Sequence, residues 1–265
     1  MNESELESRI EKPIFIFGCC NSGTTILWNA LRDHTGVSGP EIEGQDIDSL
    51  PDSMKHNLGK STFRLWAHPR FRLEYYKTEE DYDEEDRTQI IRVYSDFHEE
   101  GKRFITKSPA DTLRARLIQA YFPDAYFISI VRDGYAVSEG IIRKRKYDPD
   151  RPEFEGLHTT IDEAAEQWFR ANTIIASHQK FLNNYKIIRY EDLVKSPEGI
   201  ITSALDFCEL DSLNFTFPVF DSDLNEKQIS RLSDYEMEVV TRIAQPMLIH
   251  FGYEIYDRKL KWSDL

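Results

Sequence analysis

Four short runs rich in apolar residues predict the strands of this chain. They cover Ile14–Gly18, Phe104–Thr106, Tyr126–Val131 and Lys186–Tyr190. Nearly continuous apolar runs of this length are typical of parallel strands that are buried on both faces. A mainly parallel sheet is therefore the expected centre of the fold.

Helical patterns separate these runs. Thr160 with Glu163, and Ser233 with Glu236, form the capping-box pairs that mark two helix starts. The predicted helices cover Thr25–Leu31, Arg87–Glu100, Thr160–Asn184, Pro197–Glu209 and Ser233–Phe251. Strands that alternate with helices indicate the α/β class, and we expect a three-layer sandwich built on the parallel sheet.

A chain of 265 residues is long enough for one large α/β domain, and no stretch in its middle resembles a linker. We expect a polar tail at residues 1–12 and one domain at residues 13–265. No apolar run approaches the roughly 20 residues that span a bilayer, and the polar start lacks the apolar stretch of a signal peptide. The three cysteines suit a reducing compartment. We therefore expect a cytoplasmic protein without a membrane partner.

The balance of charge narrows the possible partners. The formal net charge is −14 at pH 7. Nucleic acids and anionic membranes attract basic surfaces, so neither is expected as the main partner. An anionic ligand would have to be held by local basic groups. The oligomeric state leaves no signal in the sequence.

The most informative stretch is the turn between the first strand and the first helix. Gly18, Gly23 and Thr25 match the phosphate loop G-x-x-x-x-G-K-[ST], except that Thr24 stands where the lysine belongs. A strand-to-helix turn directs free backbone N–H groups and the positive end of the helix dipole into the loop. The loop should bind a phosphate-like anion, although it lacks the lysine that contacts the terminal phosphates of a nucleoside triphosphate.

Three further motifs follow this loop, whose residues 22–25 read Ser-Gly-Thr-Thr. They are Lys-Ser-Pro at 107–109, Val-Arg-Asp-Gly at 131–134 and Tyr-Glu-Asp-Leu at 190–193. The order resembles that of sulfotransferases that use 3′-phosphoadenosine 5′-phosphosulfate (PAPS), above all the tyrosylprotein and bacterial branch. The resemblance spans about residues 13 to 255. It implies the phosphate-loop-like sulfotransferase fold and the transfer of a sulfonate group from PAPS to a hydroxyl or amine, with PAP as the product.

The resemblance also implies a cofactor site. Arg132 matches the family arginine that binds the 3′-phosphate, and a guanidinium can pair with two phosphate oxygens at once. Tyr190 matches the tyrosine that touches the adenine. The residues that match the 5′-phosphosulfate loop are Asn21, Ser22, Gly23, Thr24 and Thr25.

Two residues match the catalytic positions of the family. Lys107 corresponds to the lysine that contacts the transferring sulfonate. Glu43 corresponds to the glutamate that removes the proton of the acceptor, and Glu41 is held in reserve for the same role. The resemblance implies no metal, because catalysis depends on positioning and on stabilisation of charge.

The sequence departs from the family pattern at three places. The residue before Ser22, usually basic, is Asn21, and the serine expected eight residues after Arg132 is Gly140. Arg143, one helical turn later, is our candidate to compensate. The Gly-Lys pattern that closes over the 3′-phosphate is absent from residues 214–232, and Lys227 and Arg231 remain open alternatives there.

The acceptor is the least predictable part. Residues 50–101 interleave aromatic and basic side chains and are expected to form an acceptor-side insertion. The acidic runs Glu41–Asp48 and Glu79–Asp86 are expected near the acceptor, where they would favour a neutral or cationic small molecule. Two other functions stay open at this point: a small-molecule kinase and a non-catalytic nucleotide-binding module.

Overall fold

The centre of the fold is a parallel sheet. A computed structural model describes residues 10–55, 65–69, 75–143, 159–212, 215–221 and 223–256. The described residues form a five-stranded sheet in the order β2-β3-β1-β4-β5, with every neighbouring pair parallel. Its strands are β1 (Ile14–Gly18), β2 (Val37–Ser38), β3 (Arg103–Lys107), β4 (Tyr126–Val131) and β5 (Asn184–Arg189).

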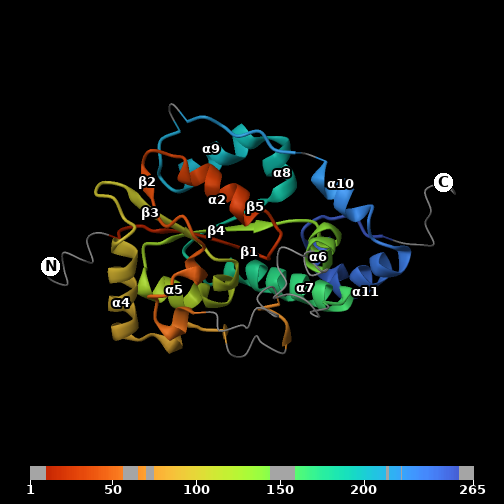
Figure 1. Cartoon of the computed structure of the whole chain (residues 1–265), viewed down its shortest axis with the longest axis horizontal. Helices are drawn as coiled ribbons and strands as arrows, with labels where there is room; N and C mark the ends of the chain where they lie inside the picture. Colours follow the sequence, from red (N-terminus) through yellow and green to blue (C-terminus); the bar gives the residue numbers. More distant parts are fainter. Residues whose placement is uncertain are drawn as a thin grey trace, which may run out of the picture.

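Helices cover both faces of this sheet, which makes a three-layer α/β sandwich (Figure 1). One face carries α2 (Thr24–Arg32), α8 (Tyr190–Lys195) and α9 (Pro197–Phe207). The opposite face carries α4 (Glu84–Ser95) and α5 (Ala115–Tyr121). A third apolar cluster joins α6 (Gly134–Arg143), α7 (Ile161–His178) and α11 (Asp234–His250).

Shorter elements complete the described chain. The six-residue helix α10 (Leu224–Ile229) packs against α6. The 3-10 helices are η1 (Gly44–Asp46), η2 (Asp52–Met54), η3 (Glu79–Asp81) and the longer η4 (Pro109–Arg114).

The central position of β1 follows from its composition. All five of its residues are buried, and it pairs with β3 on one side and β4 on the other. Apolar side chains on both faces need cover from two helical layers, which a central strand receives. The predicted strand ranges of β1 and β4 are confirmed to the residue.

Other predicted boundaries differ. The helix predicted to Asn184 ends at His178, because the backbone carbonyl of His178 accepts hydrogen bonds from the N–H groups of Phe181 (3.0 Å) and Leu182 (2.9 Å) in a turn that leads into β5. The stretch 33–50, which is outside every predicted strand and helix, contains the two-residue edge strand β2, which pairs with Arg103 and Phe104. Both predicted capping boxes are present, at Thr160 and Ser233.

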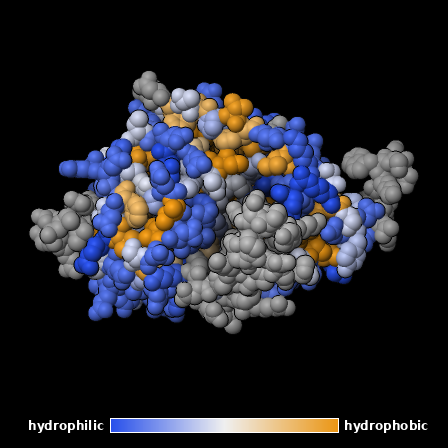
Figure 2. Space-filling model, viewed as in Figure 1, coloured by the Kyte–Doolittle hydropathy of each residue, from blue (hydrophilic) through white to orange (hydrophobic). Residues whose placement is uncertain are grey.

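The surface is largely polar. Figure 2 shows hydrophilic side chains over most of the visible coloured face, with smaller apolar patches between them. None of the helices within the described ranges is both long enough and apolar enough to cross a bilayer.

Candidate functional site

The loop after β1 adopts a conformation that its glycines and asparagine allow. Asn21 has φ 65° and Gly23 has φ 94°, both in the left-handed region. A Cβ atom on Gly23 would lie 2.6 Å from the ring of Tyr190. Glycine is therefore required at position 23 for two reasons, its backbone conformation and the close approach of α8.

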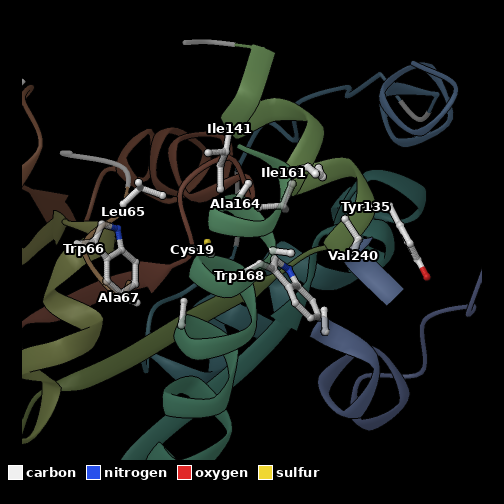
Figure 3. Packing of buried hydrophobic residues seen from close by; sticks show 14 of the residues in the cluster. Cys19, Leu65, Trp66, Ala67, Tyr135, Ile141, Ile161, Ala164, Trp168 and Val240 are labelled. Atoms are coloured by element: carbon white, nitrogen blue, oxygen red, sulfur yellow. The ribbon is translucent and has the colours of Figure 1, made fainter. Parts of the chain in front are cut away.

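The base of the loop is anchored in an apolar cluster. Cys19 is fully buried and belongs to the same cluster as Ile141, Ala164 and Trp168. Figure 3 shows Cys19 among the labelled residues of this cluster. Burial raises the pKa of the Cys19 thiol well above its ordinary value. Cys19 therefore acts as an apolar anchor of the loop.

Polar groups of the loop are available for an anion. Ser22 Oγ and Asn21 Nδ2 are buried, and neither has a hydrogen-bond partner among the described residues. Buried polar groups are normally paired, and an unpaired one indicates a missing ligand or water. Thr24, in the position of the phosphate-loop lysine, is 5% exposed and packs against Gly18. The predicted loop residues thus present backbone and neutral side-chain groups.

Lys107 lies at the carboxyl end of β3, next to this loop. Its side chain is 1% exposed, and Nζ donates a hydrogen bond to Thr25 Oγ1 (3.0 Å) and forms an ion pair with Glu43. Nζ also lies 5.6 Å from the centre of the Trp28 ring. The fold therefore brings the two predicted catalytic residues into direct contact.

The chain around Glu43 is placed by a close approach to β3. A Cβ atom on Gly44 would lie 2.9 Å from Thr106 Oγ1, so the glycine lets the segment pack against the strand. Gln45 Nε2 donates to the second oxygen of Glu43 at 3.0 Å. Glu41, the reserve candidate, is exposed and does not line the cavity described below.

Arg132 follows β4 and is 4% exposed. Its backbone carbonyl accepts a hydrogen bond from Trp168 Nε1 (2.9 Å), which holds the strand end. Its guanidinium lies 4.3 Å from the centre of the Tyr190 ring. Burial lowers the pKa of Arg132 from its ordinary value. Tyr190 is itself 1% exposed and supports both Gly23 and Arg132, so its predicted contact with adenine stays a prediction.

The position of the absent serine faces a side chain from α10. A Cβ atom on Gly140 would lie 2.9 Å from Gln228 Nε2 and 3.3 Å from Cβ of Asn21. Gln228 therefore fills the space that a residue larger than glycine would occupy. Arg143, predicted to compensate, lines the cavity, but its guanidinium pairs with Glu139 at 3.1 Å.

The two open alternatives for closing the site also have partners. Lys227 pairs with Asp221 at 3.0 Å, and both side chains are more than half exposed. Arg231 pairs with Glu139 at 3.4 Å. Neither basic group contacts Arg132 in the structure.

These residues surround one cavity of about 300 Å³. Six of the predicted site residues line it: Asn21, Gly23, Thr24, Thr25, Glu43 and Arg132. Ser22, Lys107 and Tyr190 lie directly behind this wall. Sequence reasoning did not assign to the site the lining residues Cys20, Ile26, Gln45, Leu224 and Gln228. Trp66 also lines the cavity. Trp66 lies in the predicted acceptor-side segment, where Arg64, Arg70 and Arg72 are outside the described residues.

Only one of the two acidic runs lies beside the cavity. Glu43 of the run Glu41–Asp48 lines it. The run Glu79–Asp86 instead lies along α5, where the ring of Tyr82 packs on Tyr121 at the carboxyl end of that helix. Because α5 leads to the amino end of β4, this run extends toward the sheet edge opposite the loop. Its predicted place at the acceptor is therefore wrong.

Comparisons with known proteins identify the family of the chain. A family model described as "Sulfotransferase family" matches residues 13–214. The omega-hydroxy-beta-dihydromenaquinone-9 sulfotransferase of Mycobacterium bovis is 25% identical, over 94% of this chain and 75% of its own length.

Solved structures share the fold. A sulfotransferase of Mycobacterium avium has a TM-score of 0.63 at 14% identity, over 96% of this chain and 81% of its own. The sulfotransferase domain of the curacin biosynthetic pathway has a TM-score of 0.57 at 17% identity, over 94% of this chain and 100% of that domain.

Proposed function

Since the chain belongs to the sulfotransferase family, we propose that it transfers a sulfonate group from PAPS to a hydroxyl or amine of a small-molecule acceptor. One observation carries the proposal: the anion-binding loop, the buried cation Arg132 and the Lys107–Glu43 pair meet around a single cavity. Any one of these groups alone would fit several kinds of site. Their convergence supplies a site for both ends of a phosphorylated donor and a base for the acceptor.

The residues present fit PAPS. A helix N-terminus such as the start of α2 suits the 5′-phosphosulfate. Asn21 Nδ2 and Ser22 Oγ suit it as well, because these two buried side-chain groups have no partner among the described residues. Arg132 would bind the 3′-phosphate through its planar fork. Bound there, PAPS would supply an activated sulfonate next to Lys107 and Thr25.

The chemistry assigned to the chain is positioning and stabilisation of charge. Glu43 accepts the proton of the acceptor hydroxyl or amine as the new S–O or S–N bond forms. Lys107 and Thr25 donate to the oxygens that gain negative charge as the bond to the 5′-phosphate breaks. Lys107 is buried, so its interaction with that charge is weakened little by water.

The acceptor is proposed to be a small neutral or cationic molecule. Trp66 and Pro109 give the cavity apolar walls near Glu43, and the base itself is an anion that disfavours an acidic acceptor. The curated relative acts, by its name, on a hydroxyl of a menaquinone derivative. A primary alcohol on an apolar chain is therefore the first acceptor class to test.

Binding and turnover test the proposal separately. Thermal melts should show that PAP stabilises the fold more than ATP with magnesium does. At a hundredfold excess over its Kd, PAP should stabilise the fold by about 2.7 kcal/mol relative to the ligand-free protein. Labelled PAPS with panels of alcohols, amines and phenols should then show acceptor-dependent release of PAP. A shift with ATP and none with PAP would contradict the proposal and favour a small-molecule kinase. Binding of PAP without turnover on any acceptor would favour a non-catalytic module.

A further inference from the structure

Arg132 is a buried cation whose hydrogen bonds all end on neutral oxygens. Within the described part of the chain, its guanidinium donates to the backbone carbonyl of Asn21 (2.9 Å), to Asn225 Oδ1 (2.7 Å) and to Gln228 Oε1, and it forms no ion pair. A buried charge normally has a charged partner. Here two amide oxygens from α10 occupy N–H groups that a phosphate would bind.

A carboxylate on the side away from Arg132 holds each of the two amides in this orientation. Asn225 Nδ2 donates to Glu191 at 2.7 Å, and Gln228 Nε2 donates to Glu139 at 2.9 Å. A carboxylate only accepts hydrogen bonds, so each amide must turn its NH2 group to the carboxylate and its oxygen to Arg132. If an amide rotated, its oxygen would face a carboxylate. The oxygens therefore stay on Arg132 as long as α10 stays in place.

The attachment of α10 is mostly polar. Gln228 is the one buried side chain among its six residues, all of which are described. The absence of a side chain at Gly140 leaves the space that the Gln228 amide fills. The two apolar side chains of this short helix, Leu224 and Ile229, are only half-buried, and Ile229 packs against the cluster of α6, α7 and α11. Movement of α10 therefore exposes the surface of two half-buried side chains, and the hydrophobic cost scales with that surface. A ligand that binds Arg132 strongly can therefore displace α10.

We propose that α10 is an internal competitor for the ribose-phosphate subsite: the amides of Asn225 and Gln228 occupy Arg132 in the free protein, and α10 moves aside when a nucleotide with a phosphate on its ribose binds. The inference rests on the proposed function, because it takes Arg132 as the 3′-phosphate group of the site. It adds a specific cost to the binding of that phosphate. A nucleotide without that phosphate binds without displacing the amides.

Calorimetry with PAP and with adenosine 5′-phosphate (AMP) tests the inference. Gln228→Ala removes one of the oxygens that compete for Arg132. PAP should then bind about tenfold more tightly, because in the wild type its 3′-phosphate must break the hydrogen bond between Gln228 and the charged Arg132. The affinity for AMP should stay the same, because AMP leaves that hydrogen bond in place. Ser230→Ala is the matched control, because this exposed, neutral side chain at the carboxyl end of α10 does not line the cavity. It should change neither affinity.

Hydrogen exchange supplies a readout that is independent of affinity. PAP should increase amide exchange in Leu224–Ile229 and reduce it in the loop after β1, whereas AMP should only reduce it in the loop. Weaker binding of PAP to Gln228→Ala would show that Gln228 is a ligand of the phosphate and would overturn the inference. Equal changes for PAP and AMP would also overturn it. A wild-type protein that binds neither nucleotide would refute the proposed function, and the inference with it.

Discussion

The ammonium of Lys107 contacts the carboxylate of Glu43, although the two residues are 64 positions apart in the chain. Lys107 is almost fully buried, whereas a third of the Glu43 side chain is exposed to the cavity. The pair thus has one member fixed in the sheet and one member that faces an incoming molecule. This asymmetry suits a fixed cation next to the donor and a base that meets the acceptor.

Glu43→Gln should lower kcat by about 10²- to 10⁴-fold, because the amide cannot accept the proton of the acceptor. It keeps the size of the side chain and can still accept from Lys107. The affinity for PAP should change little. Single-turnover kinetics and calorimetry would measure the two effects, with Glu41→Gln as the matched control at an exposed position. A normal rate for Glu43→Gln would exclude Glu43 as the base.

Lys107→Ala should also act on the rate more than on binding. The interaction of Lys107 with the sulfonate strengthens only as the bond to sulfur breaks, so its loss should lower kcat at saturating PAPS and acceptor. PAP affinity, measured by calorimetry, should fall less than kcat does. The role assigned to Lys107 fails if kcat is intact under saturating conditions.

Substitution of Arg132 should have the opposite effect to substitution of Lys107 and weaken the binding of PAP more than it lowers kcat. Arg132→Ala removes contacts to a phosphate that takes no part in the reaction, so it should weaken PAP by at least about tenfold and leave AMP unchanged. Arg132→Lys keeps the charge but loses the planar fork of the guanidinium, so its affinity for PAP should lie between those of the wild type and Arg132→Ala. Because Arg132 also packs on Tyr190, thermal melts must establish that each variant is folded. An equal loss for PAP and AMP would point to a general effect on the fold.

Gly23→Ala should be strongly destabilising. A left-handed backbone costs a non-glycine residue roughly 1–2 kcal/mol, and the added Cβ would also collide with Tyr190. Gly101→Ala is the matched control, since Gly101 has φ 78° and a Cβ there would meet no described atom within 4 Å. Urea unfolding of both variants separates backbone strain from collision. Equal losses at the two positions would show that the contact with Tyr190 contributes nothing.

Asp133 should make stability depend on pH. Burial raises its pKa to about 6, above the ordinary value of an unfolded aspartate. Its contribution to stability is therefore complete below about pH 4 and is lost as the pH rises through 6. Asp133→Asn abolishes this titration and can still cap α6 through its side-chain oxygen, as Asp133 Oδ1 does for the N–H of Tyr135 (2.8 Å). Relative to the variant, the wild type should lose about 2 kcal/mol of unfolding free energy between pH 4 and 7. Urea unfolding would measure both free energies. If the difference in unfolding free energy between the wild type and the variant stayed constant from pH 4 to pH 7, the raised pKa assigned to Asp133 would be wrong.

The strength of the apolar pattern decided how well each strand was predicted. The strands β1 and β4 are buried along their whole length, so their apolar runs mark their ends. The edge strand β5 begins at Asn184, two residues before its predicted start, and most of its side chains are only half-buried. The two residues of β2 are too few to form a recognisable pattern.

The residues of the candidate site also differ in how well the sequence predicted them. Its loop, Lys107 and Arg132 lie directly after apolar strands, where a parallel sheet places ligand-binding groups. Gln228 lies on a short polar helix, and nothing in the surrounding sequence distinguishes it from an exposed glutamine. Gln228 matters because the fold places its side chain against Arg132 and Gly140, which are 96 and 88 positions away in the sequence. Only the tertiary structure reveals these contacts.

The central position of β1 has a consequence for synthesis of the chain. Both of its partners come much later, since Ile14 pairs with Ile105 on one side and Tyr126 on the other. At 5–20 residues per second, a ribosome leaves this apolar strand unpaired for on the order of ten seconds. During that interval its neighbours in the nascent chain are the charged residues of the first twelve positions, which include four glutamates. Such flanking charges oppose aggregation of exposed strands, so replacement of these glutamates by alanine should lower the yield of correctly folded protein.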